Sequence, residues 1–290
     1  MLRTQLERRR LESADLTVIA HPKSGSTWLR FQLARVYQRK YGLPTSLIPR
    51  IERYHAANPA IPRLYMAGYE YIKHVMARPA PDSELASKAV VFLTRHPVDV
   101  IVSLYFHIQK HALRERKLFN DWPLDLSNVS MMEFAMSADW GLSEAIRFYN
   151  DCARHAAAMP RAHLVKYEEM RLNPGAALHR ILQFAHAPIM ESEAAEAAEF
   201  TAFEKLRDAE MRNTFNSSSL RPTKLHDPDS YKVRRGKIFG YRDYFSAAEL
   251  RRLEGMVDDM LDPSLGYSSD MTNNLMKLSE GKGSNGLSRS

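Results

Sequence analysis

The sequence predicts an α/β fold built on a parallel sheet, because three apolar runs are each followed by a helical pattern. Residues 16–20 and 89–95 are short, apolar and rich in β-branched side chains, and both lead into segments whose apolar residues recur at helical spacing. A third run, at residues 162–170, leads into a helix expected to begin near Pro174. Strands that alternate with helices usually form a parallel sheet covered on both faces.

The length and composition are those of a globular protein. The 290 residues, of which 44% are hydrophobic and 26% charged, are enough to bury one large core. We expect an N-terminal leader at residues 1–15, a single α/β domain at residues 16–267, and a disordered polar tail at residues 268–290.

The remaining elements are expected in the following order. Residues 118–160 are mostly helical in pattern, and residues 190–210 predict either a helix pair or one interrupted helix. Residues 211–237 are rich in Asn, Ser, Pro and basic side chains, which predicts a long functional loop. A final amphipathic helix begins after Ser246, which forms a predicted capping box with Glu249.

Several cellular contexts are disfavoured by the sequence. No stretch approaches the roughly 20 apolar residues that span a bilayer, and the leader lacks the apolar core of a signal peptide. Cys152 is the only cysteine, so an intramolecular disulfide is impossible and a reducing compartment is favoured. We therefore expect a cytoplasmic protein without a transmembrane segment.

The net charge of +7 favours anionic partners, which include nucleotides, nucleic acid, acidic glycans and anionic lipids. A nucleic-acid-binding protein more often gathers its basic residues in one stripe or tail. Here they are scattered, with clusters at residues 8–10, 110–117 and 232–242. We therefore expect no nucleic-acid partner.

The loop after the first strand is suited to binding a phosphate or sulfate. It reads Pro-Lys-Ser-Gly-Ser-Thr-Trp at residues 22–28, and a helix follows immediately. The backbone N–H groups at the start of that helix, the hydroxyls and Lys23 would together form a cradle for an anion. A Walker A motif is absent, because the lysine precedes the glycine. Taken alone, the loop could equally be an ordinary strand-to-helix turn with an exposed lysine.

This motif closely resembles the PKSGTTW phosphosulfate loop of the cytosolic-type sulfotransferases, which use 3′-phosphoadenosine 5′-phosphosulfate (PAPS). The resemblance implies that Lys23 contacts the bridging oxygen of the leaving phosphosulfate and that Trp28 stacks on the adenine. It also implies a 5′-phosphate site formed by Ser24, Gly25, Ser26 and Thr27.

A second motif follows the second strand, where Arg95 and Ser103 lie eight residues apart. The arginine donor fork and the serine hydroxyl can grip one phosphate together, although a structural salt bridge and a helix-interior serine would fit the same residues. The spacing is similar to the RNPKDVAVS motif of the same family, and this resemblance implies a site for the nucleotide 3′-phosphate.

A third motif is Arg234-Arg235-Gly236, which is similar to the start of the family's RKGxxGDWK segment. The resemblance implies a second grip on the 3′-phosphate by a segment that closes over the nucleotide. Residues 239–241 depart from the pattern, because Phe-Gly-Tyr stands where the family has Gly-Asp-Trp. Without the resemblance, the segment would be read as a solvated basic loop.

Weaker matches complete the expected nucleotide site. Tyr167 lies in a segment that looks like the family's YEDL element, and Thr201 and Phe203 lie in one that looks like its TSFE element. The resemblance places these three side chains near the adenine, while a purely structural role fits them equally well.

The resemblance implies one α/β domain with a central sheet of about five strands and a P-loop-like phosphosulfate-binding loop. The implied reaction is in-line sulfuryl transfer from PAPS, with PAP as the product and no metal. Catalysis would fall to Lys23, His74 and Ser103. The acceptor is an unidentified hydroxyl or amine on a small molecule, saccharide or lipid, and the oligomeric state is open.

The general base is expected to be a histidine. The family's base lies in a KTHLP-like segment ahead of the 3′-phosphate strand, and His74 lies 21 residues before Arg95. An adjacent lysine would help to keep its imidazole neutral. His107 is the competing base, since it lies four residues after Ser103 and therefore on the same face of a helix.

Two other functions remain possible at this stage. A P-loop-like nucleotide kinase shares the predicted sheet, although the Walker lysine is missing. A non-catalytic anion-binding or nucleic-acid-binding protein could keep the fold without the chemistry. A nucleophile or metal site at Cys152 and His155 is not favoured, because no paired CxxC or HExxH motif accompanies them.

Overall fold

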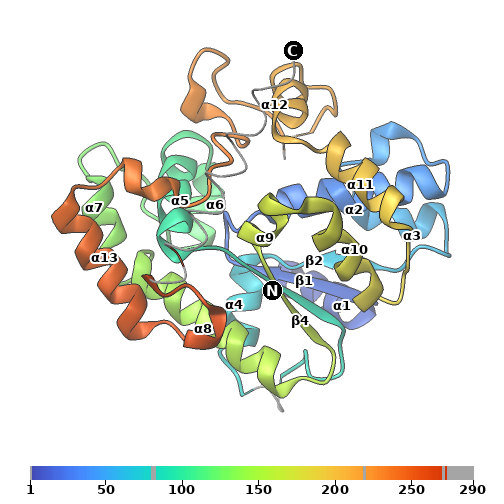
Figure 1. Cartoon of the computed structure of the whole chain (residues 1–290), viewed down its shortest axis with the longest axis horizontal. Coiled ribbons are helices and arrows are strands. Elements are labelled where there is room, and N and C mark those ends of the chain that lie inside the picture. The colour runs from blue at the N-terminus through green and yellow to red at the C-terminus, as the bar shows by residue number, and fades with distance from the viewer. Residues whose placement is uncertain (1, 80–82, 218–219, 270–271, 273–290) are drawn as a thin grey trace.

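A four-stranded parallel sheet forms the centre of the computed structural model, which describes residues 2–79, 83–217, 220–269 and 272 (Figure 1). The strand order is β2-β1-β3-β4. The strands are β1 (Leu16–Ala20), β2 (Leu64–Met66), β3 (Val90–Thr94) and β4 (Ala162–Lys166). The predicted α/β class and parallel sheet are confirmed, with four strands in the described residues where about five were expected.

The order of the strands creates a crevice at one edge of the sheet. β1 pairs with β2 on one side and with β3 on the other, so Thr17 lies opposite both Tyr65 and Val90. The chain therefore moves outward in opposite directions from the centre of the sheet. In open α/β sheets, ligands bind beyond the carboxyl ends of the strands at such a reversal.

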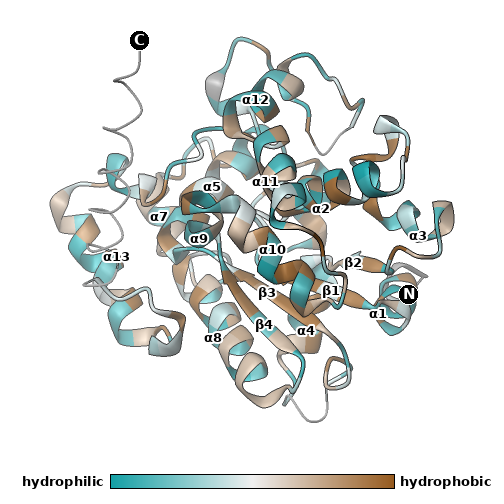
Figure 2. Ribbon diagram, turned by 45° about the vertical axis from the view of Figure 1, so that its right-hand side comes forward, coloured by the Kyte–Doolittle hydropathy of each residue, from teal (hydrophilic) through white to brown (hydrophobic). Residues whose placement is uncertain are grey.

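Helices cover both faces of the sheet, and the core is divided between the two faces. Alternate residues of β3 point to opposite sides: Val90 and Phe92 belong to one buried cluster, whereas Val91 and Leu93 belong to the other. The first cluster includes residues of α4 (Tyr69–Met76), α5 (Pro97–Lys110), α8 (Leu142–Ala158) and α13 (Ala247–Met260). The second includes residues of α2 (Ser26–Lys40), α10 (Pro174–Phe184) and α11 (Glu191–Phe200). β1, β2 and β3 are accordingly largely hydrophobic, whereas β4 includes His163 and Lys166, and the hydrophilic residues lie mainly on the helices and loops (Figure 2).

Some boundaries differ from those expected. The third apolar run, residues 162–170, is a strand only as far as Lys166, because its remainder begins a helix. Residues 2–13, expected as a leader, form a helix, and the segment near residues 190–210 is a pair of helices. The further helices are α1 (Leu2–Ser13), α3 (Tyr54–Ala57), α6 (Arg114–Phe119), α7 (Met131–Ala135), α9 (Tyr167–Leu172) and α12 (Phe203–Met211). Most of the expected tail, residues 273–290, lies outside the described residues.

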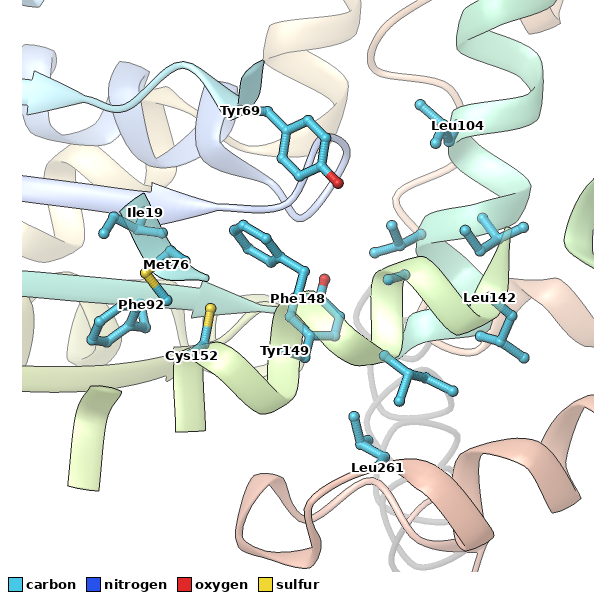
Figure 3. Close-up of a cluster of buried hydrophobic side chains, with 14 of the residues drawn as sticks. Ile19, Tyr69, Met76, Phe92, Leu104, Leu142, Phe148, Tyr149, Cys152 and Leu261 are labelled. Atoms are coloured by element: carbon cyan, nitrogen blue, oxygen red, sulfur yellow. The ribbon is translucent and has the colours of Figure 1, made fainter. Parts of the chain in front are cut away.

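Two local predictions are confirmed. The Ser246 hydroxyl accepts a hydrogen bond from the Glu249 N–H, and the Glu249 carboxylate accepts one from the Ser246 N–H, which completes the capping box of α13. The Cys152 thiol lies in the core near Met76 and Phe92 (Figure 3), and burial raises its pKa well above the usual value. A buried, protonated thiol is a poor nucleophile.

The segment after Arg235 is attached to α5 by one buried carboxylate. Asp99 accepts hydrogen bonds from the Phe239 N–H at 2.8 Å and the Tyr241 N–H at 2.9 Å. Phe239 has a φ of 55°, a left-handed conformation that is unfavourable for a bulky residue, at the position where the family pattern has glycine. The carboxylate therefore helps to hold a strained turn over the edge of the sheet.

We predict that Asp99→Ala lowers the free energy of unfolding by about 3 to 5 kcal/mol, because it leaves two buried N–H groups without their acceptor and removes the carboxylate paired with Arg95. Urea denaturation measures this change. The control is Asp208→Ala, which removes an exposed carboxylate from α12 and should alter stability by about 0.5 kcal/mol or less. Equal effects of the two substitutions would contradict the structural role of Asp99.

Candidate active site

A cavity of about 430 Å³ opens at the carboxyl ends of β1 and β3, where the strand order predicts a ligand site. It brings together all the predicted site residues except Ser24 and His74. The predicted residues that line it are Lys23, Gly25, Ser26, Thr27, Trp28, Arg95, Ser103, Tyr167, Thr201, Phe203, Arg234, Arg235 and Gly236.

The loop after β1 turns sharply into α2. Lys23 and Gly25 both have left-handed backbones, with φ values of 76° and 102°. A Cβ atom on Gly25 would lie 2.7 Å from Cδ2 of Tyr167, so this position has no space for a side chain. Ser26 and Thr27 form the first turn of α2 and line the cavity. The helix N-terminus thus supplies N–H groups and a positive dipole end to an anion.

Ser24 is the part of this loop that the structure does not place in the cavity. Its hydroxyl is buried and hydrogen bonded to the Tyr149 hydroxyl at 2.7 Å, and its N–H donates to the His21 carbonyl. The implied role of the Ser24 side chain as a phosphate ligand therefore has no support from its orientation. The side chain instead fixes the loop to α8.

Arg95 connects the parts of the site. Its guanidinium donates to the carbonyls of Lys23 at 3.3 Å and Lys237 at 3.4 Å, and it lies 3.5 Å from the Asp99 carboxylate. The same group stacks 4.4 Å above the centre of the Tyr167 ring. One buried side chain therefore holds the loop after β1, helix α5, helix α9 and the Arg234–Gly236 segment in register.

Aromatic side chains form one wall of the cavity. Trp28 packs edge to face against Tyr167, with ring centroids 5.9 Å apart, and its indole N–H donates to the Thr201 carbonyl at 2.9 Å. Phe203 closes against Gly236, where a Cβ atom would lie 2.5 Å from the Phe203 ring. Trp28, Tyr167 and Phe203 therefore give this part of the cavity an aromatic, apolar lining.

The basic segment at residues 234–236 also lines the cavity, with Gly236 against the Phe203 ring. The Arg234 guanidinium stacks 4.3 Å over the Phe106 ring and pairs with Asp229. Arg235 pairs with Asp243 at 2.6 Å. These contacts fix the orientation of both side chains, which remain at least partly exposed.

Most of the charged side chains that line the cavity are cations, and their proximity lowers the pKa values of two lysines. Burial, together with the charges of Lys232 and Arg95, lowers the pKa of Lys23 to about 7. Burial and the charge of Arg116 likewise lower the pKa of Lys232 to about 8. A bound anion would offset the neighbouring positive charges and raise the pKa values of both lysines. The remaining cations that line the cavity are Arg10, Arg30, Arg171, Arg234, Arg235 and Lys237.

The two candidate bases occupy different environments. His74 is exposed on α4 and does not line the cavity. His107 lines the cavity from α5 and is 8% exposed. Burial and the positive charge of Lys23 lower its pKa well below the usual value, so the imidazole is neutral. The placement of His74 therefore does not support its expected role, whereas that of His107 fits the competing assignment.

Sequence reasoning missed a network beside the cavity. The Glu144 carboxylate accepts hydrogen bonds from the Tyr69 hydroxyl and from Nε2 of the buried His21, and His21 directly precedes Pro22 in the loop after β1. The ring of Tyr69 packs on Phe148 with centroids 5.4 Å apart (Figure 3). The residue types gave no signal, because their partners are more than 70 residues apart in sequence.

A family comparison agrees with this geometry over most of the chain. Residues 13–265 match the family model described as the sulfotransferase domain. The chain belongs to the sulfotransferase domain family. Cytosolic sulfotransferase 12 of Arabidopsis thaliana is 24% identical over 283 residues, which cover 89% of this chain and 81% of the relative. The 3-alpha-hydroxysteroid sulfotransferase of Cavia porcellus is 20% identical, with coverage of 87% and 85%.

Solved structures of sulfotransferase-like proteins share the fold. Retinol dehydratase, in complex with androsterone and the inactive cofactor PAP, superposes with a TM-score of 0.57 at 16% identity, over 84% of this chain and 79% of its own. Within the described residues, no group of His, Cys, Asp and Glu side chains could hold a metal ion. None of the described helices has the length and hydrophobicity needed to cross a membrane.

Proposed function

We propose that this sulfotransferase domain transfers the sulfuryl group of PAPS to a hydroxyl or amine of its acceptor. The observation that carries the proposal is the convergence of the loop after β1, the Arg95 and Ser103 pair, and the Arg234–Gly236 segment on one cationic cavity. A nucleotide with a phosphate at each end of its ribose needs two separate anion sites beside an aromatic wall. The cavity offers both, and the family match favours sulfuryl transfer over the kinase alternative.

The nucleotide would lie across the ends of β1 and β3. The first turn of α2 would hold the 5′-phosphate, while Arg95 and Ser103 on α5 would bind the 3′-phosphate with help from Arg234 and Arg235. Trp28 and Phe203 would cover the base. The bound anions would restore the positive charge of Lys23, because they offset the cations that lower its pKa.

The reaction would be an in-line displacement at sulfur. The acceptor oxygen or nitrogen forms a bond to sulfur, and the bond from sulfur to the bridging phosphate oxygen breaks with its electron pair remaining on PAP. A protonated Lys23 beside this oxygen would stabilise the charge that develops there. Positioning of the two reactants supplies much of the remaining rate enhancement.

The proton of the acceptor would pass to His107. Two features support this assignment: the residue lines the cavity, and its imidazole is neutral. Lys23, the proposed leaving-group lysine, lines the same cavity. In the segment between β2 and His74, the cavity-lining residues are Met66, Ala67, Gly68, Tyr69 and Glu70.

We predict that PAP binds at least about tenfold more tightly than adenosine 5′-phosphate, because each charge-assisted contact to the 3′-phosphate contributes roughly 1.5 to 3 kcal/mol. Titration calorimetry of both nucleotides measures the difference. Ser103→Ala should weaken PAP binding and leave adenosine 5′-phosphate binding unchanged. Equal affinities for the two nucleotides in the unaltered protein would contradict the 3′-phosphate site.

We predict that His107→Ala lowers kcat by about 10² to 10⁴-fold with PAP affinity retained, because it removes the proton acceptor and no proposed nucleotide contact. His74→Ala is the matched control, and it should keep normal turnover. Steady-state kinetics and PAP titration of both variants make the comparison. The opposite pattern, with turnover lost only in His74→Ala, would return the base to His74.

A further inference from the structure

The cavity carries two cations that the proposed nucleotide contacts do not use and that belong to the region of the proposed base. They are Arg116 on α6 and Lys232, and both line the cavity. Among the described residues, the carboxylates in the lining come only from α1, α4 and the first turn of α5; they are Glu7, Glu70 and Asp99. The α6 segment and the segment at Lys232 therefore contribute cationic side chains to the lining and no acidic ones.

Arg116 lies on a face of α6 that borders the same space as His107. The His107 ring packs edge to face against Trp122, with ring centroids 6.0 Å apart, and Trp122 follows directly after α6. Arg116 and Asn120 are one helical turn apart, and the Asn120 side chain donates to the Arg116 carbonyl at 2.8 Å. Arg116, Asn120, Trp122 and His107 all line the cavity, so α6 forms the wall next to the base.

Lys232 belongs to a segment that is fixed to the end of α5. The short turn Pro228–Ser230 packs on α5, and Asp227, just before this turn, pairs at 2.9 Å with Lys110 in the last turn of the helix. Lys232 follows the turn by two residues, is partly buried and lines the cavity. The helix that carries the base is therefore flanked by α6 and by the segment that carries Lys232.

The charges of the two cations affect one another and the base. Burial and the charge of Arg116 lower the pKa of Lys232 to about 8. Burial is the largest cause of the low pKa of His107, and the charges of Lys232 and Arg116 lower it further. An imidazole with so low a pKa is a weak base, and proton transfer is most efficient when the pKa of the base lies near the working pH. A carboxylate, sulfate or phosphate bound by these cations would offset their charge and raise the pKa of His107.

We propose that the acceptor carries an anionic group near its reacting hydroxyl or amine, and that Arg116 and Lys232 bind this group. This inference rests on the sulfotransferase function proposed above. The acceptor oxygen or nitrogen forms the bond to sulfur, the bridging oxygen leaves with its electron pair on PAP, and the proton passes to His107. The anionic group itself is unchanged by the reaction. The two cations also offset the repulsion between a negatively charged acceptor and the negatively charged donor.

Matched pairs of acceptors, used with the unaltered protein, test this inference. The pairs are 4-hydroxybenzoate with 4-hydroxybenzamide, 4-hydroxyphenylacetate with 4-hydroxyphenylacetamide, and glucuronate with glucose. Sulfation by saturating PAPS is followed by mass spectrometry, and binding to the PAP complex is followed by calorimetry. We expect the charged member of at least one pair to bind the PAP complex about tenfold more tightly than its neutral partner and to be sulfated with a correspondingly higher kcat/KM. If no charged member has this advantage in binding or in kcat/KM, the inference is wrong.

Two substitutions test the residues that would bind the anionic group. Arg116→Gln and Lys232→Gln each remove one charge and keep a polar side chain. Each should raise the KM for the charged acceptor about tenfold and reduce its advantage over the neutral partner, while the affinities for PAP and PAPS stay normal. Arg114→Gln is the matched control, because Arg114 is an exposed residue of the same helix that does not line the cavity. Weaker PAPS binding in both variants, with the preference for the charged acceptor unchanged, would assign the two cations to the donor and overturn the inference.

The affinity for PAP separates the two levels of the proposal. If the unaltered protein fails to bind PAP, the proposed function fails and the acceptor inference fails with it. If PAP binds normally and the charged acceptors have no advantage over their neutral partners, the acceptor inference alone is wrong.

Discussion

The site depends on the buried guanidinium of Arg95. It contacts the carbonyl of Lys23, the carboxylate of Asp99 and the ring of Tyr167, and these partners belong to three different connections at the carboxyl edge of the sheet. Asp99 also accepts a hydrogen bond from the Phe239 N–H, so the segment after Arg235 depends on Arg95 indirectly, through Asp99. The parallel sheet brings the loops to one edge, and Arg95 determines how they lie relative to one another.

Positive charge held close together is the second constraint. The lowered pKa of Lys23, about 7, reflects burial beside other cations, and it has a functional consequence. Without an anion, the lysine is only partly protonated near neutral pH; an anionic nucleotide favours the protonated form. In the proposed mechanism, the bound donor would thus favour the charged form of the lysine that stabilises the leaving oxygen.

The strand-loop-helix units could be predicted from the sequence, because local patterns determine them. The family resemblance named most of the residues that the structure brings together around one cavity. β2 was missed because three residues, Leu64–Met66, are too few to show a period. The Ser24 side chain points toward Tyr149, which lies 125 residues away in the sequence, so no local motif could predict this orientation. His74 has a suitable sequence distance from Arg95, but α4 buries Ile72 and Val75 and leaves His74 exposed. His107 shares a helical face with Ser103, and α5 places both of them in the lining of the cavity.

The central claim is that Lys23 assists departure of the phosphosulfate oxygen, and the single-turnover rate of sulfuryl transfer from PAPS by Lys23→Ala tests it most directly. The variant should fold normally and bind PAP with near-normal affinity, because its contact strengthens only as charge builds on the leaving oxygen. The rate of the chemical step should fall by about 10² to 10³-fold. An unchanged rate in a folded Lys23→Ala protein would contradict the account.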